Sequence, residues 1–361
     1  MKRTAVGVYG LGVYLPETIR TNDWWPAEVV AKWGGTHNGR LDRPPEGPEE
    51  LETEGARMVL EAMAHYRADP FKGTKQRRVM SPDMQTTDME LLAAQQALQN
   101  AGVEPKEIDL FLSSTTLPDF LMSPNSCKVH EQLGLPKRCF TLQTEGVCNA
   151  FLMQLALAEQ MIASGQAHRA LLVQSAGMSR LHLPDDPMSA WFGDAATAVV
   201  VGPVEEGYGV HGRAHMTDGS LYGAVVAGLP GKRWYDDGLV RGYVANPALA
   251  RKMVTAGLHD SKEIVRAALE EAQVKPEQVD FYGSHQGFVW FREVTQRLVG
   301  IAHAKTVDTY TWAGSCLGAN IPLGLYTAEK EGTLQPGDRA VLMSGGVGAV
   351  LSSVVMRWGR G

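Results

Sequence analysis

Cys148 is the side chain of this sequence best placed to act as a nucleophile. It follows Glu145-Gly146-Val147 and precedes a run, from Ala150 to Ile162, whose composition predicts a helix that is apolar on most faces. A thiol at the amino end of a helix faces unpaired N–H groups and the positive end of the helix dipole, which lower its pKa. Free cysteine is also commonly buried as a small apolar residue, so position alone favours a nucleophile and a packing role about equally.

His285 is the second candidate for chemistry. It lies in FYGSHQGF, where a predicted apolar strand ends. Strand ends are where α/β folds gather reactive groups, and a histidine there can transfer protons. A lone histidine is usually structural or exposed, but the other histidines of this chain have no comparable context. The position therefore favours a functional role.

Two further segments offer polar or backbone groups. WAGSCLGANIPLG carries Ser315, Cys316 and Asn320 before an apolar helix, and these residues either share the Cys148 pocket or pack tightly at a helix start. SGGVGA places Gly346 and Gly348 in a tight turn whose N–H groups could bind an oxyanion. Such turns are common, and this one does not fit a phosphate-binding or dinucleotide-binding fingerprint. The spacing of cysteine and histidine indicates no metal site.

Internal repetition predicts how these residues are positioned. AAQQALQNAGVEPKEIDLFLSS, from residue 93, resembles RAALEEAQVKPEQVDFYGSH, from residue 266, at an offset of 171. HRALLVQSAG resembles DRAVLMSGGVG at an offset of 170, and the Cys148 segment resembles the Cys316 segment at an offset of 168. Each copy reads as a helix, a short turn and an apolar strand. The repeat places His285 opposite Ser114, so the halves share a frame but not their chemistry.

The alternation predicts an α/β protein of two duplicated halves, residues 1–205 and 206–361. The opening segment predicts a strand that ends before Pro16, and AATAVVVG, from Ala195, predicts a buried strand. Residues 24–78 fit the repeat less well. Their glycine-rich and proline-rich stretch, residues 34–48, predicts a surface excursion.

Composition excludes several classes of protein. The chain has 361 residues, of which 44% are hydrophobic, and a net charge of −6, which gives no general affinity for nucleic acid or anionic membrane. Its four cysteines form no CxxC pair and suggest free thiols in a reducing compartment. No window approaches 18 consecutive apolar residues, so we expect a cytoplasmic protein without membrane spans.

Taken together, these motifs resemble the ketosynthase III (3-oxoacyl-acyl-carrier-protein synthase III) family of the thiolase superfamily, nearly end to end. The resemblance rests on five segments, in chain order: GLGVYLPE with Thr21-Asn22, Cys148 with its helix, WFGDAATAVVVG, Ser284-His285-Gln286, and PLGLYTAEKEGTLQPGDRAVLMSGGVGA. It implies a five-layered αβαβα thiolase-like fold and a homodimer. It further implies no permanently bound cofactor and an acyl thioester of coenzyme A, or of the phosphopantetheine arm of an acyl carrier protein, as substrate.

The resemblance also implies residue roles. Cys148 would attack the thioester while backbone N–H groups of Cys148 and of Gly346, Val347 and Gly348 hold the oxyanion. Covalent catalysis of this kind divides one difficult transfer into two easier steps. His285 would handle protons or stabilise charge in the second step. Further candidates for the pocket or its loops are Cys316, Asn320, Phe288 and Met122.

Three departures from the family pattern point to a specialised member. Decarboxylating members carry an asparagine where this chain has Ser315, so the site for an enolate is weakened. The family's His-Gln-Ala-Asn is altered to end in Phe288. The usual tryptophan-containing coenzyme A segment is not recovered upstream of Lys75-Gln76-Arg77-Arg78. Lys75, Arg77 and Arg78 are candidates for docking an acidic acyl carrier protein, although such a run is more often a solvated turn.

Three functions remain open from the sequence. The leading hypothesis is an acyltransferase (EC 2.3.1-like) of secondary metabolism, in which acyl-Cys148 passes its acyl group to a small acceptor and His285 is the base for an oxygen or nitrogen nucleophile. The alternatives are decarboxylative carbon–carbon condensation with a malonyl thioester, and a non-catalytic subunit that binds acyl carriers. Retention of Cys148 and His285 argues against the last.

Overall fold

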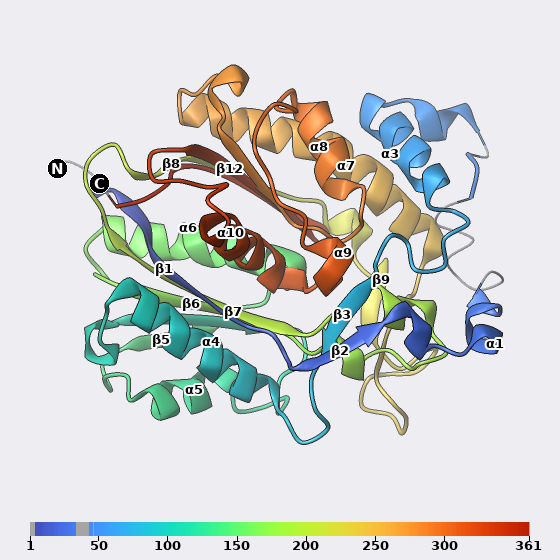
Figure 1. Ribbon diagram of the computed structural model, residues 1–361, viewed down its shortest axis with the longest axis horizontal. Helices are drawn as coiled ribbons and strands as arrows, with labels where there is room; N and C mark the ends of the chain where they lie inside the picture. Colours follow the sequence, from blue (N-terminus) through green and yellow to red (C-terminus); the bar gives the residue numbers. More distant parts are fainter. Residues whose placement is uncertain (1–3, 34–42, 46, 361) are drawn as a thin grey trace.

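The computed structural model describes residues 4–33, 43–45 and 47–360 and has the five-layered αβαβα architecture that the family resemblance implied (Figure 1). Two mixed β-sheets lie one above the other, with helices between them and on both outer faces. In this described part of the chain, no helix combines the length and apolar character needed to cross a membrane.

The first sheet takes its strands from the amino-terminal half. Their order in the sheet is β1-β7-β6-β4-β5, with β1, β7 and β6 antiparallel in succession and β6, β4 and β5 parallel. The strands are β1 (Val6–Tyr14), β4 (Leu110–Thr115), β5 (Phe140–Gln143), β6 (Ala170–Ala176) and β7 (Ala195–Pro203). The predicted opening strand and the predicted buried strand from Ala195 are both confirmed.

The second sheet repeats this order. Its strands are β8 (Gly209–Thr217), β11 (Phe281–Ser284), β12 (Arg339–Gly346) and β13 (Val350–Arg357). They are arranged β11-β12-β13-β8, with β11 and β12 parallel and the other pairs antiparallel. Since β8, β13, β12 and β11 match β1, β7, β6 and β4 in order and direction, the duplication inferred from sequence is confirmed. The predicted division near residue 205 falls between β7 and β8.

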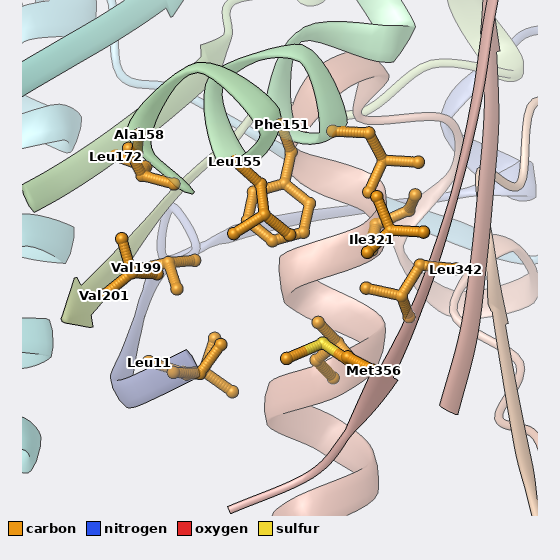
Figure 2. Close-up of a cluster of buried hydrophobic side chains, with 14 of the residues drawn as sticks. Leu11, Phe151, Leu155, Ala158, Leu172, Val199, Val201, Ile321, Leu342 and Met356 are labelled. Carbon is orange, nitrogen blue, oxygen red and sulfur yellow. The ribbon is translucent and has the colours of Figure 1, made fainter. Parts of the chain in front are cut away.

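Two helices fill the layer between the sheets. They are α6 (Ala150–Ala163) and α10 (Asn320–Lys330), and α6 contacts strands of both sheets. Figure 2 shows their apolar side chains, among them Phe151, Leu155 and Ile321, meeting Leu172 and Leu342 from the two sheets. Burial of this apolar surface on both sides holds the halves together. The amino ends of α6 and α10 are thereby fixed between the sheets.

The outer faces are covered by two helix pairs (Figure 1). On the first sheet these are α4 (Thr86–Ala101) and α5 (Asn125–Leu133), and on the second they are α7 (Pro247–Glu271) and α8 (Phe291–Val299). Close packing of α4 on β1 depends on glycine, because a Cβ at Gly12 would lie 2.0 Å from the backbone oxygen of Ala93. Gly212 of β8 approaches the backbone of α7 in the same way, at 2.3 Å from Ala268 O.

The turns that precede α6 and α10 are equivalent, but with a register different from the predicted one. Each is a single turn of 3-10 helix, Val147–Asn149 and Leu317–Ala319, whose first residue has a positive φ. The offset is therefore 170, which agrees with the other repeats. The offset of 168 that aligned Cys148 with Cys316 is wrong, because the backbone places Cys316 opposite Gly146.

The segment from residue 24 to 78 is only partly a surface excursion. It contains α1 (Ala27–Val30) and α3 (Glu54–His65), and α3 packs on α7 and α8 of the other half. Its end forms β3 (Gln76–Val79), which pairs with β2 (Thr18–Thr21). Residues 34–42 and 46, within the predicted glycine-rich and proline-rich stretch, lie outside the described residues.

Candidate active site

One apolar cavity of about 430 Å³ brings the principal predicted residues together. Cys148, His285 and Ser315 all line it, although they come from three segments of the chain. Its walls are extended by α7 and by the hairpin of β9 (Val225–Gly228) and β10 (Arg241–Val244). The volume is that of a typical site for a small molecule or a substrate arm. Sequence analysis predicted the catalytic end of this cavity but not these two walls, since nothing in their apolar patterns separates lining from core.

The turn that carries Cys148 holds a strained backbone. Val147 has φ of 48°, a left-handed conformation that a β-branched residue rarely adopts. The Asn149 N–H donates to Gly146 O at 2.8 Å, and the Ser344 hydroxyl donates to Cys148 O at 2.8 Å. These bonds hold the sharp turn, which presents the Cys148 side chain to the cavity. Strain of this kind is found where a reactive side chain must be aimed.

The expected lowering of the Cys148 pKa is not what the site produces. Burial raises the pKa of the Cys148 thiol to about 12, and the nearby Glu145 carboxylate acts in the same direction, whereas the residue's own backbone N–H opposes it. The amino end of α6 is present as predicted, but its stabilisation of a thiolate is outweighed by desolvation. Cys148 is therefore a neutral thiol in this resting site.

His285 follows β11 directly, as predicted. Its backbone N–H donates to Met343 O at 2.9 Å, which continues the pairing of β11 with β12, and its side chain is buried. Burial lowers the pKa of His285 to about 4, and a hydrogen bond with the Leu317 backbone opposes this shift. The imidazole is therefore neutral at physiological pH.

Asn320 determines which nitrogen of His285 carries the proton. Its Oδ1 accepts from the Cys316 backbone N–H at 2.7 Å, which fixes the orientation of the amide. Its Nδ2 then faces His285 Nδ1 at 3.0 Å and can only donate. Because Nδ1 accepts this bond, the ring proton of neutral His285 resides on Nε2. The sequence placed Asn320 near the pocket but did not pair it with His285.

Ser315 is fully buried in the wall of the cavity. Its backbone N–H donates to Trp191 O at 2.8 Å, and its carbonyl accepts from the Gly193 N–H at 3.1 Å. The Ser315 Oγ has no hydrogen-bond partner among the described residues. A buried hydroxyl without a partner is uncommon and is available to bind a substrate.

The glycine-rich turn lies against the Cys148 turn, as its predicted role requires. Gly346 lines the cavity, and a Cβ on it would lie 2.7 Å from Gly146 O and 3.3 Å from the Asn149 backbone nitrogen. Only glycine permits this approach. Gly345 and Val347 also line the cavity, whereas Gly348 is not among the lining residues.

The remaining pocket candidates fall into different places. Phe288 lines the cavity and stacks on Trp290, with ring centroids 5.1 Å apart. Cys316 is fully buried behind the wall, and burial raises its pKa. Met122 is 85% exposed in the loop between β4 and α5 and is not among the residues that line this cavity.

Of the three predicted basic docking residues, Arg77 is contradicted by its burial. Arg77 is fully buried, and its guanidinium donates to Arg20 O, Asn22 Oδ1 and Ala190 O. Arg78 is half-buried and donates to Pro16 O. Because side chains alternate along a strand, Arg77 and Val79 of β3 are buried while Gln76 and Arg78 are only half-buried. Only Lys75 is exposed.

A histidine that sequence analysis did not select also lines the cavity. His182 is buried in the same wall as Phe192 and Trp191. It lies in a loop between one-turn helices, where no periodic pattern marks it. Within the described residues, no group of three or more His, Cys, Asp or Glu side chains could hold a metal ion.

Comparison with known protein families gives two matches. The family described as 3-Oxoacyl-[acyl-carrier-protein (ACP)] synthase III matches residues 142–219, which include Cys148. The family described as 3-Oxoacyl-[acyl-carrier-protein (ACP)] synthase III C terminal matches residues 269–358, which include His285, Ser315 and Gly346. The two matches therefore contain the catalytic candidates of both halves.

Solved structures similar to this chain have the same fold. A 3-oxoacyl-[acyl-carrier-protein] synthase III from Aquifex aeolicus VF5 is 25% identical, with a TM-score of 0.77, over 98% of this chain and all of that one. The priming β-ketosynthase of the R1128 polyketide pathway is 22% identical, with a TM-score of 0.77, over 99% and 98% of the chains. Xanthomonas campestris OleA, with bound lauric acid and lauroyl-CoA, is 19% identical, with a TM-score of 0.73, over 98% and 99% of the chains.

Proposed function

Since this chain belongs to the 3-oxoacyl-[acyl-carrier-protein] synthase III family of thiolase-like acyltransferases, we propose that it transfers an acyl group through an acyl-Cys148 intermediate to a small acceptor. The observation that carries this proposal is the single apolar cavity shared by Cys148, His285 and Ser315. The donor is a thioester of coenzyme A or of an acyl carrier protein, and the pathway is one of secondary metabolism.

In the first step, Cys148 Sγ forms a bond to the thioester carbonyl carbon. The carbonyl oxygen gains negative charge and is held by the backbone N–H groups of Cys148 and Gly346, whose turns lie against each other. The bond from carbon to the donor's sulfur then breaks, and the proton of the Cys148 thiol leaves with the donor thiol. Because the resting thiol is neutral, proton removal accompanies attack rather than preceding it.

The second step depends on what attacks the acyl group. In the leading proposal, an oxygen or nitrogen nucleophile attacks the acyl carbon, the bond from that carbon to Cys148 Sγ breaks, and the nucleophile's proton passes to Cys148, which leaves as a thiol. The buried Ser315 hydroxyl, without a partner, is placed to orient such an acceptor. Decarboxylating members carry an asparagine at the position of Ser315, so the polar group offered to the acceptor differs.

Carbon–carbon condensation is a second candidate, and the arrangement of His285 favours it. A proton on Nε2 makes neutral His285 a donor rather than a base at that nitrogen. A donor can stabilise the enolate oxygen that forms when a malonyl thioester loses carbon dioxide. Ser315 would then supply the second donor in place of asparagine.

A single-turnover experiment separates these candidates. Enzyme preloaded with an acyl group is mixed with malonyl-CoA or with small alcohols and amines, and carbon dioxide and products are quantified. The leading proposal predicts esters or amides without carbon dioxide release, and Ser315→Asn raises malonyl decarboxylation by about tenfold or more. Release of carbon dioxide with a β-keto product from the unaltered enzyme would establish condensation instead. Ser315→Ala is the control that removes the hydroxyl without adding an amide.

The transferred group is proposed to be a hydrocarbon chain. Nearly all groups that extend the cavity away from Cys148 are apolar, among them Met188, Val244, Met253 and Leu258. The OleA structure with lauroyl-CoA provides a precedent for a long acyl chain on this fold. Loading rates measured with acetyl to lauroyl thioesters test this, and preference for acetyl would contradict it.

A homodimer is proposed on the edge of the first sheet. β5 is the last strand of that sheet, and its Phe140 and Leu142 are exposed. The nearby exposed loop residues Phe120, Leu121 and Met122 add large apolar side chains. Exposed apolar surface on an edge strand typically marks an interface. Light scattering of the intact protein tests this, and a monomer at micromolar concentration would contradict it.

A further inference from the structure

His182 is a buried polar side chain in an otherwise apolar wall of the cavity. It lies between the one-turn helices Met178–Arg180 and Pro187–Ala190, and only 1% of its side chain is exposed. Neither ring nitrogen makes a hydrogen bond to another described residue. Such groups are rare because leaving a buried polar atom unpaired costs free energy.

The orientation of the ring is fixed by two neighbours. Phe192 stacks on it, with ring centroids 5.2 Å apart and planes inclined by 14°. Gly242 of β10 lies beside the Cε1–Nε2 edge of the ring, where a Cβ would come within 2.8 Å of His182 Cε1 and 3.1 Å of Nε2. The Gly242 N–H also donates to Leu181 O at 3.0 Å, which ties β10 to this loop. Any residue larger than glycine at position 242 would therefore fill the space beside Nε2.

A carboxylate beside Nδ1 influences which nitrogen of His182 carries the proton. Asp186 Oδ2 lies 3.7 Å from His182 Nδ1, beyond hydrogen-bond distance but within range of electrostatic attraction. A negative charge beside Nδ1 favours the tautomer with the proton on Nδ1. Nε2 then carries a lone pair, so it accepts a hydrogen bond and cannot donate one.

His182 lies close to the catalytic candidates and is connected to Ser315 through Phe192. Phe192, which stacks on the ring, forms an isolated parallel β-bridge with Ser315, and both residues line the same cavity as Cys148. His182 is thus one side chain away from the loop that carries Ser315. A substrate group that fills the cavity from Cys148 passes along this wall.

We infer that His182 Nε2 accepts a hydrogen bond from a hydroxyl or amino group carried by the substrate that occupies this cavity. The inference rests on the proposed function, in that the occupant is an acyl chain or its acceptor, and it defines a substrate class: a largely apolar molecule with one internal O–H or N–H donor. The same chemistry could come from the acyl group or from the acceptor, and the test distinguishes the two sources.

Binding is measured first, in a background that cannot form an acyl-enzyme. Isothermal titration calorimetry on Cys148→Ala compares octanoyl-CoA with hydroxyoctanoyl-CoA and methoxyoctanoyl-CoA thioesters, substituted at successive carbons. The methoxy compounds keep the oxygen but cannot donate. A second set of titrations, the acceptor arm, compares octanol with an octanediol and with the monomethyl ether of that diol on the same protein.

In one of the two arms, the hydroxylated compound is expected to bind at least about fivefold more tightly than both analogues. Adding His182→Phe should abolish this preference, and His182→Gln, whose side-chain oxygen can accept, should restore part of it. Met188→Leu alters the same wall without a hydrogen-bonding group and should change all affinities alike. Preference for hydroxylated acyl groups identifies the donor as the source, and preference for diols identifies the acceptor.

Absence of a preference in both arms, or a preference that His182→Phe leaves unchanged, would overturn the inference. A failure of the proposed transferase function can be distinguished from a failure of the His182 inference by a separate measurement. If unaltered Cys148 forms no acyl adduct by intact mass while the Cys148→Ala protein still prefers hydroxylated ligands, the role of His182 stands and the transferase proposal falls.

Discussion

Asn320 Nδ2 lies 3.0 Å from His285 Nδ1, and this contact joins the helix of the middle layer to the end of a strand in the second sheet. The amide cannot turn around, since its oxygen is held by the Cys316 N–H. Asn320 therefore positions the His285 ring and assigns its proton without lining the cavity. The serine that replaces the family's asparagine, Ser315, lies five residues earlier in the same segment.

Replacing Asn320 should impair transfer more than loading. Asn320→Ala leaves the buried His285 Nδ1 without a partner, a cost of about 1–3 kcal/mol, so we expect a loss of about 5- to 100-fold in the transfer step. Asn320→Asp should instead move the ring proton to Nδ1 and raise the His285 pKa, because a carboxylate accepts but does not donate. Single-turnover rates measured against pH separate the two variants. Equal pH profiles for Asn320→Asp and the unaltered enzyme would contradict a role in setting the tautomer.

The Cys148 thiol should be alkylated slowly near neutral pH, and its alkylation rate should keep rising with pH without reaching a plateau. Since burial raises its pKa to about 12, the thiolate fraction rises tenfold per pH unit between pH 7 and pH 9. Iodoacetamide labelling followed by peptide mass spectrometry should give a rate with that slope, and the Cys148→Ala protein identifies the peptide. A rate that levels off below pH 8 would show a thiolate stabilised by its surroundings and contradict the neutral resting thiol.

The glycine at the contact between the two turns should not tolerate a methyl group. In Gly346→Ala the new Cβ would meet Gly146 O at 2.7 Å, so the Cys148 turn must move. Displacements near 1 Å at a reacting centre cost about 100-fold in rate, and we expect a loss of this order in acyl loading. Gly219→Ala is the matched control, because a Cβ there meets nothing within 4 Å and its φ is not positive. Equal loading by both variants would remove the turn from the proposed oxyanion site.

Glu90 should make the protein less stable as pH rises. Burial, with a contribution from Asp119, raises its pKa from 4.5 to about 7, although hydrogen bonds from Ser175 and Asn125 and the charge of Lys128 act in the opposite direction. The folded state thus binds more protons than the unfolded state between these two pH values. Stability from this group is present below pH 4.5 and is lost as pH rises through about 7.

Glu90→Gln removes this titration and provides the measurement. The difference in unfolding free energy between the variant and the unaltered protein should grow in favour of the variant from pH 5 to pH 8, by up to about 3 kcal/mol. Urea unfolding at several pH values gives this difference. A difference that does not change with pH would mean that Glu90 titrates normally.

How much of this could be predicted from the sequence is clearest at the two turns. The duplication follows from segments that match at offsets near 170, and the strands and the helix after Cys148 follow from local hydrophobic patterns. The register between the halves did not, because matching Cys148 to Cys316 by residue type gave 168, whereas the positive φ of Val147 and Leu317 gives 170. Backbone conformation at two apolar residues leaves no mark in a sequence pattern.

Some residues of the candidate site could likewise be predicted from the sequence and others could not. Cys148, His285, Ser315 and Gly346 lie at element ends that a pattern can locate, and they meet in one cavity. Arg77 was misplaced because three basic residues among four, Lys75-Gln76-Arg77-Arg78, suggest a surface, while strand alternation buries Arg77. Asn320 and His182 acquire their roles from neighbours 35 and 10 residues away, through contacts of side chains that no spacing reveals.

The most direct test of this account is the mass of the intact protein after incubation with acyl-CoA and acyl-carrier thioesters. The account predicts a gain equal to the acyl group, located on the Cys148 peptide and absent from the Cys148→Ala protein. The adduct should be discharged by the true acceptor and persist without it. Loading of the Cys148→Ala protein to the same extent, or no adduct on the unaltered protein with any acetyl to lauroyl donor, would contradict the central claim.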